Sequence, residues 1–131
     1  MEGPSSKVSE KTEIEILNDV NQLVPGSQMH KALFSQQVYD EMENSAKEQD
    51  RIFGVECGSE YNIETASVIV SDPIQLVAGH GSPIAGRWIY RFQAARCSDI
   101  KIFNLMAMAD GSGEVKFRSL IPGNTIADLQ L

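Results

Sequence analysis

The sequence is poor in the two residue types from which many metal and catalytic sites are built. Its 131 residues include two histidines, His30 and His80, and two cysteines, Cys57 and Cys97. Zinc sites combine several such residues at short spacings, and none of these four has a partner at such a spacing. The glycine-flanked segment 79–82 matches neither a nucleophile elbow nor a phosphate-binding loop. We therefore expect no metal ion and no cofactor.

Long apolar runs are also missing, since none approaches the ~20 residues of a membrane-spanning helix. Basic residues are outnumbered, with 11 Lys and Arg against 18 Asp and Glu, for a net charge of -7. This balance argues against nucleic acid or an anionic membrane as the main partner. The first residues lack the basic start and apolar stretch of a secretory leader. The location stays open: periplasmic or secreted if a leader has been removed, cytoplasmic otherwise.

The acidity is concentrated in the first half of the chain. Residues 1–65 carry thirteen acidic and five basic side chains, whereas residues 66–131 carry five acidic and six basic ones. Either the first half forms a solvated acidic face, or it meets a basic partner. The length suits one domain, and we expect a loose tail over residues 1–9 followed by a single domain over residues 10–131.

Helical signals occupy the first part of that domain. Acidic early turns and the stop signal Pro25-Gly26 predict a helix over residues 10–24. Ser27 is suited to cap a second helix, whose apolar positions recur every four or five residues. The polar run 44–50 is expected to lead the chain out of that helix. In residues 51–57 the apolar side chains change to the two-residue spacing that is typical of a strand.

Strand signals follow. Residues 61–71 are rich in β-branched side chains, and Asp72-Pro73 is expected to end that strand. Residues 76–83 are predicted to form an exposed loop. Further strands are predicted over 87–93, where aromatic residues alternate, over the apolar segment 100–108 and over 115–118, with a hairpin at 110–113 and a closing turn at 122–124. We predict an α+β fold, with two N-terminal helices packed on an antiparallel meander of four to six strands.

The two cysteines are either inert thiols or one disulfide that closes a loop of about forty residues. Glu56 and Glu60 would oppose formation of a Cys57 thiolate. Cys97 adjoins Arg96 but has no histidine nearby in the sequence. Arg96 favours a Cys97 thiolate, so a Cys–His pair assembled by the fold is an alternative to the expected buried thiol or disulfide.

Four basic residues fall at alternate positions of two predicted strands: Arg87, Arg91, Lys116 and Arg118. If these strands are neighbours, the four side chains share one face of the sheet. Such a face could dock onto an acidic surface or hold an anionic ligand. It could equally be the solvated side of a half-buried sheet.

The C-terminal third resembles small exported domains of proteobacteria. The residues that carry the resemblance are Gly86-x-Trp88, Cys97, Asn104, Asp110-Gly111 and the segment 120–125. The resemblance implies an envelope location and a disulfide at Cys97. It implies no particular activity.

Three hypotheses for function follow. The first is a non-enzymatic module that binds a protein partner through the basic residues. The second is a small-molecule carrier or isomerase-like enzyme with a cone-shaped pocket, similar to nuclear transport factor 2, in which Tyr61, Asp72 and His80 supply polar groups and His80 acts as the base. A cavity that reaches His80 would favour it. The third is a homo-oligomer formed through an exposed sheet edge.

Overall fold

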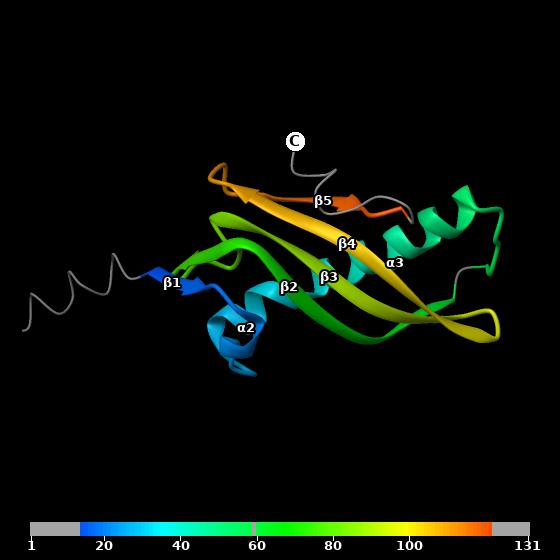
Figure 1. The fold of residues 1–131 in the computed structure, drawn as a ribbon, viewed down its shortest axis with the longest axis horizontal. Coiled ribbons are helices and arrows are strands. Elements are labelled where there is room, and N and C mark those ends of the chain that lie inside the picture. The colour runs from blue at the N-terminus through cyan, green and yellow to red at the C-terminus, as the bar shows by residue number, and fades with distance from the viewer. Residues whose placement is uncertain (1–13, 59, 122–131) are drawn as a thin grey trace, which may run out of the picture.

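The computed structural model describes residues 14–58 and 60–121. Within them the chain forms β1 (Ile14–Leu17), the 3-10 helix η1 (Val20–Gln22), α2 (Gln28–Leu33), α3 (Gln36–Ile52), β2 (Tyr61–Val77), β3 (Ala85–Arg96), β4 (Asp99–Asp110) and β5 (Val115–Ser119). The strands form one antiparallel sheet in the order β1-β2-β3-β4-β5, and α3 lies against one face of it (Figure 1). The predicted α+β class is confirmed. The predicted tail 1–9 and closing turn 122–124 lie outside the described residues.

The predicted helix over residues 10–24 is wrong for the part that the structure describes. Residues 14–17 form β1, which pairs with the last residues of β2, from Ile14 opposite Val77 to Leu17 opposite Ile74. Leu17 is only 3% exposed, so the pairing places it in the core. This tertiary pairing outweighs the local helical preference of the acidic residues in that segment.

The second predicted helix is present but is broken into two. Ser27 caps α2, as predicted, since its Oγ accepts a hydrogen bond from the backbone N–H of His30 at 3.1 Å. A second cap at Ser35 starts α3, where the Ser35 Oγ accepts from the N–H of Val38 at 3.4 Å. The break between the two helices explains why the apolar spacing before and after it is irregular.

The prediction that the polar run 44–50 leads the chain out of the helix is wrong, because α3 continues to Ile52. The strand-like alternation expected in residues 51–57 is likewise not found, since no strand forms there. Two polar residues of this run face the sheet instead of water. The hydroxyls of Ser45 and Ser119 lie 2.6 Å apart, and the Gln49 Nε2 donates to the backbone carbonyl of Asn104 at 3.2 Å. Buried polar side chains are tolerated where they are hydrogen-bonded in this way.

The strand β2 continues past Asp72-Pro73, so the prediction that it ends there is wrong. Two register shifts against β3, on either side of Asp72, accommodate the proline, which donates no backbone hydrogen bond. Gly86 of β3 lies opposite, with φ +122°, and a Cβ atom there would be 2.6 Å from the Pro73 carbonyl oxygen. Glycine at position 86 therefore allows β3 to pass close to Pro73 of β2. Beyond this point, the last residues of β2 pair with β1.

The core lies between α3 and the sheet face turned toward it, which we call the inner face. The predicted aromatic stripe of β3, formed by Trp88, Tyr90 and Phe92, is fully buried there. The Trp88 and Tyr90 rings pack edge-on, with centroids 6.4 Å apart, and Met42 of α3 is equally buried. The predicted strands β3, β4 and β5 and the hairpin at 110–113 are confirmed.

Candidate functional site

The four predicted basic residues lie on the sheet face turned away from α3, which we call the outer face. In the register of the sheet, Arg87 lies opposite Met108, which in turn lies opposite Lys116. Met106 lies opposite Arg118 in the next row. Since directly opposed residues project to the same side, the basic side chains lie on one face of the sheet. The sequence-based hypothesis required the two strands that carry them to be neighbours, but they are not, because β4 lies between β3 and β5.

Acidic neighbours pair with two of these cations. The Arg87 guanidinium donates from Nε and Nη2 to one Asp72 carboxylate oxygen, at 3.0 and 2.7 Å. The Lys116 ammonium lies 3.6 Å from Asp110. The Ser112 hydroxyl and backbone N–H, with a smaller effect of that ammonium, hold the pKa of the exposed Asp110 carboxyl below its usual range. These two cations are therefore partly neutralised.

The other two cations, Arg91 and Arg118, form no ion pair with a carboxylate of residues 14–58 and 60–121. Beside them, Ile89 of β3 lies opposite Met106 of β4, and with Leu120 these two form a small buried apolar cluster, each at most 9% exposed. Other apolar side chains of the outer face are exposed: Ile69 at 41%, Ile100 at 60% and Ile102 at 45%. Within the part of the chain that the structure describes, the outer face thus carries two arginines that form no ion pair, together with several exposed isoleucines.

The structure does not bring together the three predicted polar groups of an enzyme. Tyr61 begins β2, while His80 follows the end of the same strand, so they lie at opposite ends of the sheet. Asp72 is held by Arg87 on the outer face, whereas Tyr61 is buried on the inner side. His80 is exposed in the connection between β2 and β3. No general base is therefore assembled from these three residues.

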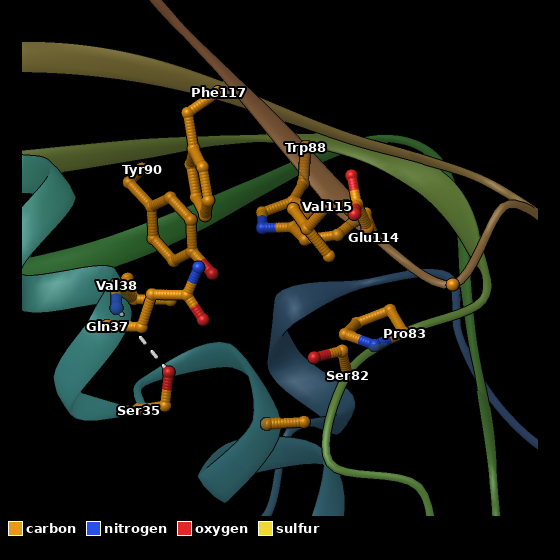
Figure 2. Close-up of a pocket in the computed structure, with 12 residues that line it drawn as sticks. Ser35, Gln37, Val38, Ser82, Pro83, Trp88, Tyr90, Glu114, Val115 and Phe117 are labelled. Carbon is orange, nitrogen blue, oxygen red and sulfur yellow. Dashed lines mark hydrogen bonds between the residues drawn. The ribbon is translucent and has the colours of Figure 1, made fainter.

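A cavity of about 380 Å³ opens beside that connection (Figure 2). It is lined by Ser82 and Pro83 of the connection, together with residues of α3, β3 and β5, but His80 does not line it. This cavity is therefore not the cone-shaped pocket that was expected around His80. We call this part of the molecule, where the β2–β3 connection, the β4–β5 turn and the start of α3 meet, the loop end.

At the opposite end, Cys57 and Cys97 form a disulfide, with their Cα atoms 5.0 Å apart. The bridge resolves the two alternatives that the sequence left open. It ties the segment after α3 to the turn between β3 and β4, and we call this part of the molecule the disulfide end. Disulfides form and persist mainly in oxidising compartments.

Beside the disulfide lies a buried charged cluster that the sequence did not reveal. Asp50 is 1% exposed, and its carboxylate contacts the Arg96 Nη1 at 2.6 Å and accepts a hydrogen bond from the Tyr61 hydroxyl at 2.6 Å. Burial and the bond to Asp50 raise the pKa of Tyr61 to about 12. The two charged groups are paired with each other, so the cluster joins the end of α3 to the sheet.

The described residues contain no group of three or more His, Cys, Asp or Glu side chains placed to hold a metal ion. None of the helices in this part of the chain has the length and apolar composition needed to cross a membrane. Comparison with known proteins found no matching family model, curated protein or solved structure. The resemblance to exported proteobacterial domains stays a prediction.

Proposed function

We propose that the protein is a non-enzymatic interaction module whose outer sheet face docks onto an acidic protein surface. The observation that carries the proposal is that Arg91 and Arg118 share the outer face with exposed isoleucines and form no ion pair within residues 14–58 and 60–121. Arginine and methionine are enriched at the centres of protein interfaces, where aliphatic contact and charge-assisted hydrogen bonds act together.

The distribution of charge supports an acidic partner. The exposed side of α3, on the far side of the sheet, carries acidic residues such as Asp40 and Glu48. An acidic partner is therefore repelled by the helical side and attracted by the outer face. Opposed potentials of this kind orient a partner before contact and select against wrong docking modes.

The aliphatic residues distinguish a protein partner from a simple polyanion. A solvated sheet face is mainly polar, whereas this one exposes Ile69 and Ile102 and buries Ile89 against Met106. Nucleic-acid interfaces gain their affinity chiefly from cations on phosphates, which aliphatic side chains cannot bind. A protein surface offers both carboxylates and apolar contact.

An oxidising compartment is the setting that we propose for this interaction. The support is the Cys57–Cys97 bridge, because such bridges are rare in the reducing cytosol. Periplasmic or secreted action follows from this proposal.

The proposal can be tested with a fluorescently labelled oligoglutamate peptide that contains two central leucines. The double variant Arg91→Glu and Arg118→Glu should bind this peptide about tenfold more weakly than the wild type, since two attractive contacts become repulsive. The matched control is Arg51→Glu, which reverses an exposed cation on α3 and should leave the affinity unchanged.

Two results would contradict the proposal. Equal loss of affinity in the control variant would mean that only net charge matters. Tighter binding of a single-stranded oligonucleotide of equal charge would favour nucleic acid instead. Light scattering on the same samples reports whether the outer face binds a second copy of the chain.

A further inference from the structure

One side of β2 is covered by another strand over only a small part of its length. β2 pairs with β3 from Tyr61 to Gln75, whereas β1 pairs only with residues 74–77. Among the described residues, the backbone of residues 61–72 forms no hydrogen bond to any strand other than β3. To the right of α2 in Figure 1, the green ribbon of β2 forms the lower outline of the sheet. We call this side of residues 61–72 the open edge.

Side-chain burial decreases from β3 to β2. On the inner face, Ala66 and Val70 of β2 are only half-buried. The β3 residues that lie opposite them, Phe92 and Trp88, are each 1% exposed. On the outer face, Ile69 of β2 is 41% exposed. This decrease is expected for a strand whose far side is accessible to solvent or to a partner.

The open edge lacks the features that normally protect an exposed strand. Residues 65–71 contain no charged residue and no proline, and β-branched side chains predominate among them. Long, uncharged edges of this kind pair readily with other strands, so natural proteins usually shorten them or place lysine or proline in them. The edge of the sheet at β5 is protected in this way, since β5 is short and carries Lys116 and Arg118.

We propose that the open edge pairs with the same edge of a second copy of the chain. The two five-stranded sheets then form one continuous antiparallel sheet across a two-fold axis. This makes specific the third hypothesis from the sequence, which named no strand. A second copy fits because its residues 65–71 are equally long, uncharged and rich in β-branched side chains, and such cross-strand pairs are favourable.

The shape of β2 also suits a symmetric partner. Its register shifts against β3, between Ile63 and Thr65 and between Val70 and Asp72, flank residues 65–70 on both sides. Antiparallel pairing about the middle of this stretch therefore places the regular part of one copy opposite the regular part of the other.

Charge selects the position of the axis. An axis at Val68 would set Glu64 of one copy opposite Asp72 of the other, and like charges in that position are destabilising. An axis at Ser67 avoids this and sets Thr65 opposite Ile69, two β-branched side chains. In this arrangement Ser67 of one copy lies directly opposite Ser67 of the other.

The first test is the mass of the full chain in solution, measured by light scattering over a dilution series. We expect twice the mass of one chain at the highest concentrations, with a dimer dissociation constant in about the micromolar range. Hydrogen exchange then locates the contact. Amides of residues 65–71 that do not bond to β3 should gain protection as the protein concentration rises.

Ser67→Lys is the test variant, and Asn104→Lys is its matched control. Both positions lie opposite Arg91, with Ser67 at the open edge and Asn104 on the interior strand β4. Each variant therefore adds one cation to the same row of the outer face. Ser67→Lys opposes two ammonium groups across the axis and should raise the dissociation constant by at least about tenfold. Asn104→Lys should change it by less than about twofold.

The inference is overturned if the chain stays monomeric throughout the dilution series. Protected amides at the open edge of such a monomer would mean that another segment of the chain covers it, which also overturns the inference. A dimer that Asn104→Lys weakens as much as Ser67→Lys does would be joined through the outer face, again against the inference. The peptide assay reports on Arg91 and Arg118 in monomer or dimer, so the docking proposal stands or falls separately.

Discussion

Different interactions stabilise the two ends of the sheet. At the disulfide end, a covalent bridge and the buried pair of Asp50 and Arg96 join α3 to the strands. At the loop end, the β2–β3 connection is held by backbone hydrogen bonds, from His80 to Val77 at 2.9 Å and from Ile84 to Gln75 at 2.8 Å. That end also contains the cavity, which the buried Trp88 helps to line.

The difference lies in how far apart in the chain the joined residues are. The bridge and the ion pair of the disulfide end join α3 and the segment after it to the end of β3, whereas the hydrogen bonds of the loop end join residues that are close in the sequence. We therefore expect the disulfide end to lose more stability when its long-range contacts are removed.

The largest effect should come from removing the bridge. The double variant Cys57→Ala and Cys97→Ala releases a loop with a sequence separation of 40 residues. We expect the free energy of unfolding to fall by about 4 kcal/mol on the chain-entropy account, measured by urea denaturation.

Hydrogen exchange on that double variant tests the comparison itself. Amides at the start of β2 should lose more protection than amides at the start of β3, which lie at the loop end. Equal loss at both ends would mean that the bridge stabilises the fold only globally and that the two ends do not differ in the way proposed.

An intermediate effect is expected from pH, through Tyr61. Burial and the hydrogen bond to Asp50 raise its pKa from 10.0 to about 12. Because folding raises this pKa, the contribution of the neutral hydroxyl is fully present below pH 10 and is lost as the pH rises through 12. Between these values the stability of the wild type should fall by about 2 kcal/mol more than that of Tyr61→Phe.

The measurement is guanidinium unfolding of both proteins across that pH range. The Tyr61→Phe variant keeps the buried Tyr90, so any loss common to both proteins belongs to other groups. Parallel curves for the two proteins would show that Tyr61 is not coupled to the buried carboxylate.

The smallest effect is expected at the loop end. His80→Ala removes an exposed side chain that no described hydrogen bond or ion pair uses, so the free energy of unfolding should change by less than about 0.5 kcal/mol. Thermal unfolding followed by circular dichroism is sufficient for this comparison. A loss above about 1.5 kcal/mol would place His80 in a stabilising contact and weaken the contrast between the two ends.

The strands with alternating side chains were predictable from the sequence, because alternation is a local signal. Trp88, Tyr90 and Phe92 define an inner face, and the same alternation sends Arg87 and Arg91 to the outer one. The four basic residues share that face because β3, β4 and β5 are paired in sequence order, with β4 between the two strands that carry them.

The errors arose where distant residues decide the local structure. Residues 14–17 are a strand because the end of β2 pairs with them. Asp50 stays in the helix because Arg96, which lies 46 positions later in the chain, neutralises it. The cavity depends on the break between α2 and α3 and on where the β2–β3 connection passes, and neither is encoded in the spacing of nearby residues.

The bridge also determines what a single cut in the chain would do. Cys57 and Cys97 flank β2 and β3, so together with the connection of residues 78–84 they close this hairpin into a ring. A protease that cleaves within that connection opens the ring without separating its two halves. The nicked protein would run as one chain in a non-reducing gel and as two fragments once a thiol reagent is added.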